Sequence, residues 1–144
     1  PHGQLEIMTT PLLETPQIVI ICHPHPLHLG TMQNKVVTAL TKACITQGYA
    51  TVRFNYRGVG QSSGEYGHMQ GEIEDLQSVC AWVRAQIPQA SIALAGFSFG
   101  SYIAASVANQ LDDCRWLVTV APSVLHADFT PLTQVSCPLL VVQG

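Results

Sequence analysis

The chain has few charged residues, and this scarcity limits the partners that it can bind. Only 10% of its 144 residues are Asp, Glu, Lys or Arg, and the net charge is −3. A net negative charge disfavours nucleic acid or an anionic membrane as the main partner, so we expect neither. The longest apolar runs are far too short to cross a bilayer. No signal peptide is recognisable, and because the sequence starts at Pro1 rather than Met, we expect the natural N-terminus to precede it.

The cysteines form no pattern that indicates disulfides or a metal site. Five are present, which is an odd number, and no two are spaced Cys-x-x-Cys. Several lie inside apolar segments; the positions are Cys22, Cys44, Cys80, Cys114 and Cys137. This usage is typical of reduced, buried thiols, so we expect a cytoplasmic protein.

Apolar segments dominate the rest of the composition and predict the fold class. Hydrophobic residues make up 47% of a chain long enough for one domain, 1–144, with its own core. Runs rich in β-branched residues alternate with segments of helical periodicity, which predicts βαβ units. The expected fold is an α/β three-layer sandwich, a mostly parallel sheet with helices on both faces. We expect strands at 4–8, 18–22, 49–54, 91–95, 116–120 and 138–142, and helices at 34–47, 72–87 and from about 101 to 111.

A Gly-x-Ser-x-Gly motif, Gly96 to Gly100, lies between the 91–95 strand and a helical segment of small residues. This is the context that a nucleophile elbow requires. Such a turn is so tight that its central residue takes a positive φ, and glycines are needed at both flanks to avoid collisions with the neighbouring strand and helix. We predict that Ser98 is a nucleophile held at the carboxyl edge of the sheet. The alternative is an ordinary glycine-rich turn with a solvated serine.

A serine nucleophile also needs N–H donors for the oxyanion that develops on its substrate. The first candidate is the N–H of Phe99, which opens the helix after the serine. The second should come from the loop after the 18–22 strand, which reaches the same edge of a parallel sheet. Two prolines in this loop have no N–H and exclude both a strand and a helix there. The remaining candidate is therefore His25, with Leu27 as the alternative.

Three histidines, His23, His25 and His28, lie close enough in sequence to suggest a metal site. The prolines between them keep the segment extended, and no acidic residue or cysteine lies beside them as a fourth ligand. We therefore interpret His23 and His25 as hydrogen-bonded loop residues that stiffen the oxyanion wall, and we predict no metal or cofactor. A metal-dependent enzyme that uses this loop is the alternative.

Charged residues follow the 49–54 strand at the same edge of the sheet. Arg57 could contact an anionic substrate, but an arginine in such a loop more often pairs with a carboxylate, and we favour this bracing role. The acidic residues nearby are expected to serve the loop and the first turn of the next helix rather than catalysis. They are Glu65, Glu72, Glu74 and Asp75.

Four motifs occur in order along the chain, and together they are far more specific than the serine motif alone. They are Cys22-His23-Pro24-His25-Pro26-Leu27, Gly30-Thr31-Met32-Gln33-Asn34-Lys35-Val36-Val37, Arg53-Phe54-Asn55-Tyr56-Arg57-Gly58-Val59-Gly60 and Gly96-Phe97-Ser98-Phe99-Gly100. This set resembles a group of small bacterial α/β hydrolases related to dienelactone hydrolases. The resemblance covers nearly the whole chain and implies an α/β-hydrolase fold with its C-terminal part missing. It also implies a Ser-Asp-His triad with Ser98 as nucleophile, and an oxyanion hole made by Phe99 and the His25 region.

The acid and the base of this triad are not evident within the chain. In α/β hydrolases they follow the serine in the order acid, then histidine. The resemblance implies an acid a few residues beyond Gln143-Gly144 and a histidine one strand later. Asp128 and His126 follow the 116–120 strand as substitutes, but the histidine precedes the acid, and one short loop is poorly suited to supply both groups. His68 is a weaker candidate.

The sequence therefore predicts a serine hydrolase that cleaves a small ester, lactone or thioester through an acyl-enzyme on Ser98. The expected partner is a small ester-like molecule. The alternative is a catalytically incomplete, non-enzymatic α/β domain that lacks the acid and the base. Removing one essential triad member costs about 10⁶ in kcat in a well-studied serine protease, so the location of these two groups decides between the alternatives.

Overall fold

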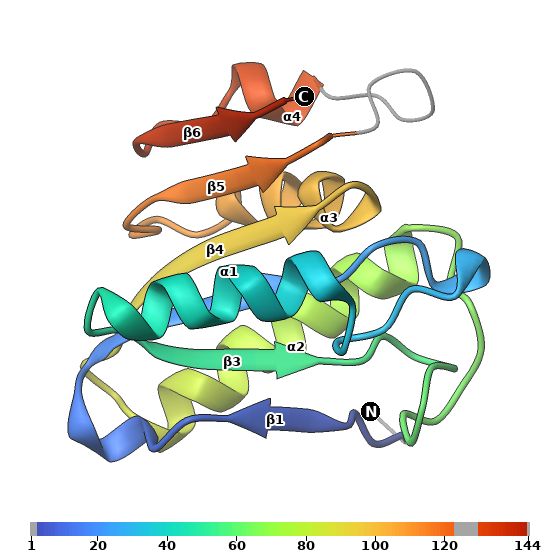
Figure 1. Ribbon diagram of the computed structural model, residues 1–144, viewed down its shortest axis with the longest axis horizontal. Helices are drawn as coiled ribbons and strands as arrows, with labels where there is room; N and C mark the ends of the chain where they lie inside the picture. The colour runs from blue at the N-terminus through green and yellow to red at the C-terminus, as the bar shows by residue number, and fades with distance from the viewer. Residues whose placement is uncertain (1–2, 123–129, 144) are drawn as a thin grey trace.

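The strands of the computed structural model form one mixed sheet (Figure 1). The structure describes residues 3–122 and 130–143, and within these ranges the sheet has six strands in the order β1-β3-β2-β4-β5-β6. Strand β1 runs antiparallel to β3, and the other neighbours are parallel. The strands are β1 (Ile7–Thr9), β2 (Gln17–Cys22), β3 (Ala50–Phe54), β4 (Ser91–Phe97), β5 (Leu117–Val120) and β6 (Leu139–Val142).

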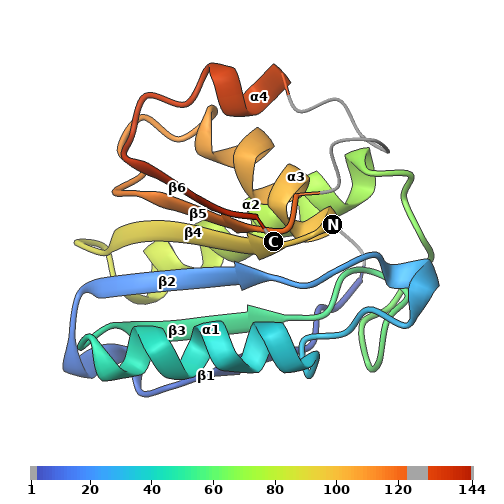
Figure 2. The same cartoon turned by 45° about the horizontal axis from the view of Figure 1, so that its top comes forward.

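Helices cover both faces of this sheet. The α-helices are α1 (Lys35–Thr46), α2 (Gln70–Gln86), α3 (Phe99–Ala108) and α4 (Thr130–Thr133), and the short 3-10 helices are η1 (Leu12–Glu14) and η2 (Pro26–His28). Helix α1 lies in front of the sheet in Figure 1, whereas α2 and α3 lie behind it, and Figure 2 shows the same layers from a second direction. The predicted three-layer α/β sandwich is confirmed. None of the helices in the described ranges has the length and hydropathy needed to cross a membrane.

Strand β2 lies inside the sheet and explains the continuous apolar run in the sequence. Its residues Ile18–Cys22 are all 0% exposed. Val19 and Ile21 pack in the cluster on the α1 side, whereas the other three residues belong to the larger core beneath α2 and α3. A strand that is buried on both faces has no polar side to present to solvent, so its sequence does not alternate.

Two local predictions need correction. The expected strand at 4–8 is displaced to β1, because the backbone of Gln4 bonds instead to Ser63 (Gln4 N–H to Ser63 Oγ 2.7 Å, Ser63 N–H to Gln4 O 2.9 Å). The Glu6 N–H donates to Ser62 Oγ at 2.9 Å in the same way. The loop after β2, expected to hold no helix, contains η2. This helix begins at Pro26, where a missing N–H costs nothing because the first helical position has no intrahelical partner.

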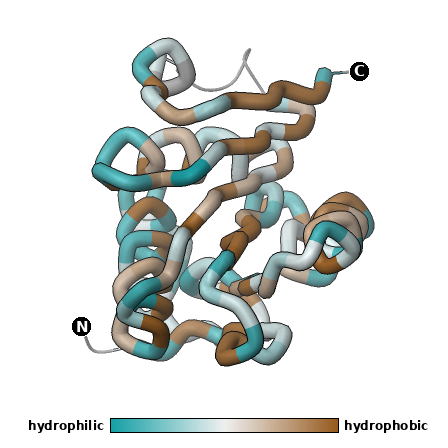
Figure 3. Tube along the Cα trace, turned by 90° about the vertical axis from the view of Figure 1, so that its left-hand side faces the viewer, coloured by the Kyte–Doolittle hydropathy of each residue, from teal (hydrophilic) through white to brown (hydrophobic). Residues whose placement is uncertain are grey.

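Strand β6 lies at the edge of the sheet and is much less covered than β2. Its four residues are 39%, 57%, 44% and 46% exposed along Leu139–Val142. Figure 3 shows this strand as a run of hydrophobic residues next to the C-terminus. The sheet therefore has a well-covered interior and one apolar edge that the described residues leave open.

Candidate active site

Ser98 lies on the sharp turn between β4 and α3. Its backbone has φ 55° and ψ −115°, a conformation that L-residues rarely adopt and that costs about 1–3 kcal/mol. Two hydrogen bonds hold the turn: the Ser98 N–H donates to Val120 O at 2.8 Å, and the Ser98 carbonyl accepts from the Ser101 N–H at 2.9 Å. The turn therefore has the strained geometry of a nucleophile elbow and stands at the carboxyl edge of the sheet.

The flanking glycines are required by the packing around this turn. A Cβ at Gly96 would overlap the carbonyl oxygen of Gly100, and a Cβ at Gly100 would overlap that of Cys22. The Ser101 hydroxyl oxygen lies 3.0 Å from Gly96 O and 3.2 Å from Val120 O and shares its proton between these two carbonyls, so it ties the first turn of α3 to β4 and β5. Strand, turn and helix approach one another more closely here than any side chain at the two glycine positions would allow.

The loop after β2 meets this turn, as the predicted oxyanion hole requires. The ring of His25 lies against the ring of Phe99, with 4.6 Å between their centroids. The His25 carbonyl accepts from the N–H groups of His28 and Gly30, both at 3.0 Å, which closes the loop into a compact turn. The Leu27 N–H is already engaged, because it donates to His25 Nδ1 at 3.1 Å. The geometry therefore favours His25 over Leu27 as the second donor, and both oxyanion assignments stay predictions.

His23 connects this loop to the segment after β3. It is fully buried; its Nδ1 lies 2.7 Å from Pro24 O, and its Nε2 accepts from the Tyr56 N–H at 3.2 Å. The Tyr56 hydroxyl returns a hydrogen bond to the His23 carbonyl at 3.1 Å. Burial lowers the pKa of His23 to about 4, so the ring is neutral near pH 7. Both ring nitrogens are used within the protein, as expected for a loop-stiffening residue rather than a metal ligand.

A second set of contacts holds the loop between β3 and α2, and it includes a residue that the sequence did not single out. Glu72 is 0% exposed, and its carboxylate accepts the N–H groups of Gly67 at 2.8 Å and Met69 at 2.9 Å. This confirms the expected role of Glu72 at a loop and a helix start. Tyr66 lies in the same loop, with its ring centroid 5.3 Å from that of His25 and 6.5 Å from that of Phe99. Its only signal in the sequence is its place after a strand that ends at the active edge.

Comparison with known proteins places this geometry in a family. A family model described as serine aminopeptidase, S33, matches residues 14–143. The chain belongs to the S33-like α/β serine hydrolases. The resemblance to α/β hydrolases and the α/β-hydrolase fold are thus confirmed.

Solved structures of this serine hydrolase family match the chain over nearly its whole length. A structure from Coxiella burnetii, named as an α/β serine hydrolase homologue, is 53% identical, with a TM-score of 0.93, and the match covers 100% of this chain and 70% of that one. A structure from Xanthomonas campestris, named as an α/β serine hydrolase without lid, is 40% identical, with a TM-score of 0.86. The match covers 97% of this chain and 65% of that one. An uncharacterized protein from Rickettsia prowazekii is 35% identical over 131 residues, which are 88% of this chain and 55% of that protein. The chain thus spans little more than half of this curated relative.

The sequence offers three candidate substitutes for the acid and the base of the triad. Asp128 and His126 fall outside the described residues. His68 has its ring 4.9 Å from that of Tyr66, on the exposed side of the β3–α2 loop. Among the described residues, no three His, Cys, Asp or Glu side chains are grouped so that they could hold a metal ion.

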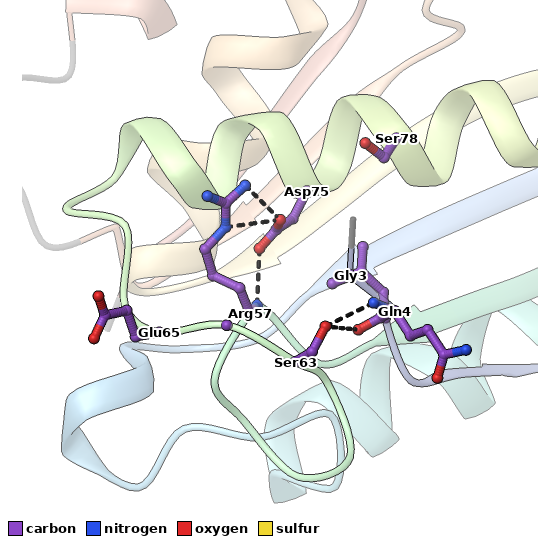
Figure 4. Close-up of a pocket in the computed structure, with 9 residues that line it drawn as sticks. Gly3, Gln4, Arg57, Ser63, Glu65, Asp75 and Ser78 are labelled. Carbon is purple, nitrogen blue, oxygen red and sulfur yellow. Dashed lines mark hydrogen bonds and ion pairs between the residues drawn. The ribbon is translucent and has the colours of Figure 1, made fainter. Parts of the chain in front are cut away.

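Arg57 has the bracing role that the sequence predicts. Its Nε donates to Asp75 Oδ1 at 3.0 Å, its backbone N–H donates to Asp75 Oδ2 at 2.8 Å, and its guanidinium lies 3.3 Å from Glu74. Figure 4 shows this pair beside a cavity of about 560 Å³ between the N-terminal segment, the β3–α2 loop and α2. Ser98 does not line the cavity, whose wall includes Glu65 and Ser78. Arg57 is thus committed to the scaffold of the hydrolase rather than to an anionic substrate.

Proposed function

We propose that this protein is a serine hydrolase that cleaves a small ester, lactone or thioester through an acyl-enzyme on Ser98. The observation that carries the proposal is the positive φ of Ser98 on a turn between β4 and α3, flanked by glycines that no other residue could replace. Strain of this kind persists only where the surrounding structure enforces it, and it concentrates at functional sites. Membership of the serine hydrolase family supports the same conclusion.

The proposed reaction follows from the groups around the turn. Ser98 Oγ attacks the substrate carbonyl carbon while its proton passes to a general base. The carbonyl oxygen becomes an oxyanion, which accepts hydrogen bonds from the N–H groups of Phe99 and His25 and is further stabilised by the positive end of α3. Collapse of this intermediate expels the alcohol or thiol, which takes a proton from the base. Water then attacks the acyl-enzyme by the same steps, releases the acid and regenerates the serine.

The acid and the base are assigned by the order of residues in this family. Both follow the nucleophile along the chain, acid first and histidine second. We place them after β6, in the polypeptide beyond Gly144, rather than at Asp128 and His126. Activity is accordingly proposed for the full-length polypeptide, since this chain spans only 65% of the Xanthomonas relative and 70% of the Coxiella relative.

A small, uncharged ester-like substrate in the cytoplasm fits the composition of the site. The rings of His25, Tyr66 and Phe99 lie around the turn, whereas Arg57, which lies in the same β3–α2 loop as Tyr66, is paired with Asp75. Buried thiols such as Cys22 and Cys80 support the proposal of a reducing compartment. In the part of the chain that the structure describes, this wall is aromatic, which favours neutral acyl groups over carboxylate or phosphate substrates.

The experiment that tests the proposal is active-site labelling of the full-length polypeptide. A fluorophosphonate probe should label Ser98, the protein should hydrolyse p-nitrophenyl acetate, and both signals should disappear in Ser98→Ala. Ser106→Ala is the matched control, because that hydroxyl bonds Tyr102 O at 2.9 Å within α3, so labelling should persist. A chelator should leave turnover unchanged. Folded protein that neither reacts with the probe nor hydrolyses the ester would support the non-enzymatic alternative.

A further inference from the structure

Tyr66 lies where the two predicted oxyanion donors meet. Its hydroxyl is 3.4 Å from His25 Nε2, and its ring is tilted against the His25 ring. The His25 ring in turn contacts Phe99, so the three rings form one cluster between the β2–η2 loop and the start of α3. Because Tyr66 comes from the β3–α2 loop, three separate segments of the chain are joined at this point.

The hydrogen bonds of His25 define how Tyr66 acts on it. His25 Nδ1 accepts from the Leu27 N–H at 3.1 Å, so in the neutral ring the proton is on Nε2. Nε2–H then donates to the Tyr66 hydroxyl. The imidazole is thus held at both nitrogens, by its own loop on one side and by Tyr66 on the other. A ring held at both ends limits the rotation of the His25 backbone, which carries the predicted donor N–H.

Glu72 holds the loop that presents Tyr66. Its buried carboxylate bonds the N–H of Gly67, the residue directly after Tyr66, and the N–H of Met69. In the same loop, His68 and Met69 have φ values of 54° and 76°, which are unfavourable for residues with side chains. Burial of a carboxylate is costly unless its oxygens accept hydrogen bonds. Because the Glu72 oxygens bond two N–H groups of this loop, the carboxylate stabilises the conformation that presents Tyr66.

We propose that Tyr66, held in place by Glu72, is a positioning residue that fixes His25 for stabilisation of the oxyanion. This inference rests on the proposed hydrolase function of Ser98. It assigns Tyr66 no contact with the substrate: the hydroxyl acts through His25. Loss of the Tyr66 hydroxyl should therefore reduce stabilisation of the transition state, which carries the oxyanion. Binding of the neutral substrate should be unchanged.

The test is Tyr66→Phe in the full-length polypeptide, which removes one hydroxyl and keeps the ring. We expect kcat to fall about five-fold with KM unchanged, as for loss of one hydrogen bond felt only in the transition state. Affinity for a boronic acid, which forms a tetrahedral adduct on a serine, should fall by a similar factor.

A second variant, Glu72→Gln, tests the residue that holds the loop. It keeps the shape of the side chain, but its amide oxygen can accept only one of the two loop N–H bonds, so kcat should also fall.

Tyr49→Phe is the matched control. The Tyr49 hydroxyl also accepts a hydrogen bond, from Trp116 Nε1 at 3.2 Å, but it lies in the cluster on the α1 side of the sheet. Its removal should leave kcat and boronic acid affinity unchanged. In addition, ¹⁵N spectra of the His25 ring should show the proton on Nε2 in the wild type.

The outcomes separate this inference from the function on which it rests. Wild-type protein that labels at Ser98, combined with a Tyr66→Phe variant of wild-type kcat, overturns the positioning role alone. A change in KM without a change in kcat also overturns it, as does a His25 proton on Nδ1. Folded wild-type protein that fails to react at Ser98 overturns both proposals.

Discussion

Strands β2 and β6 are both short apolar runs, yet they lie in opposite surroundings. Residues Ile18–Cys22 of β2 are 0% exposed, whereas Leu139–Val142 of β6 are 39% to 57% exposed. Strand β2 lies between β3 and β4 with helices over both faces, whereas within residues 3–122 and 130–143 strand β6 pairs with β5 alone. The same kind of sequence is therefore core in one place and surface in the other. The candidate site stands on the covered half, at the ends of β2 and β4.

The largest expected effect tests how tightly that covered half is packed. Gly100→Ala would drive a Cβ into the backbone carbonyl of Cys22 at the end of β2, and we expect a loss of about 4 kcal/mol or more in the free energy of unfolding. Gly48→Ala is the control, because that glycine has φ 90° but no atom within 4 Å of its would-be Cβ. It should cost only about 1–2 kcal/mol, from backbone strain alone. Urea unfolding of both variants measures the difference, and equal losses would contradict it.

A second prediction concerns pH and the buried histidine at the end of β2. The folded pKa of His23 is lowered to about 4 by burial, below the ordinary value of about 6.5. The unfolded chain therefore takes up a proton first as pH falls. The contribution of the neutral His23 side chain to stability is complete above about pH 6.5. As the pH falls from about 6.5 to 4, the free energy of unfolding decreases by about 3 kcal/mol in total.

Urea unfolding at a series of pH values measures this loss. His23→Asn should be less stable than wild type at pH 7, because it loses hydrogen bonds to Pro24 O and the Tyr56 N–H. It should also lose most of the pH dependence over this range. A variant that keeps the full wild-type dependence would show that another group is responsible.

The smallest effect compares β2 and β6 directly, with the same substitution in each. Val19→Ala removes buried methyl groups and should cost about 2 kcal/mol. Val141→Ala in the 144-residue chain changes a residue that is 44% exposed and should stay within about 0.5 kcal/mol of wild type. In a longer polypeptide, the cost of Val141→Ala should rise toward that of Val19→Ala if further chain covers β6. An unchanged small cost there would show that this edge stays open.

The parts of the fold that could be predicted from sequence are those with a local cause. The β2 run and the glycines of the serine turn each act within a few residues. Strand β1 was misplaced because Gln4 and Glu6 bond to serines of the β3–α2 loop, more than 50 positions away. The candidate site divides in the same way.

Within the site, the elbow and its two flanking glycines follow from the motif, and the approach of His25 follows from the parallel sheet. The contact between Tyr66 and His25 does not, because the two residues are 41 positions apart and their meeting depends on the loop conformation that Glu72 holds. Contacts that depend on loop conformation leave no periodic trace in the sequence.

The hydrogen bonds to the Val120 carbonyl have a consequence for how the protein folds. Both the Ser98 N–H and the Ser101 hydroxyl use this acceptor on β5. During synthesis on the ribosome, β2, β3 and β4 emerge first, but the serine turn lacks this acceptor until β5 has left the exit tunnel and paired. Parallel pairing of this kind is non-local and therefore slow. Formation of the strained serine turn should accordingly be a late event that follows the pairing of β5 with β4.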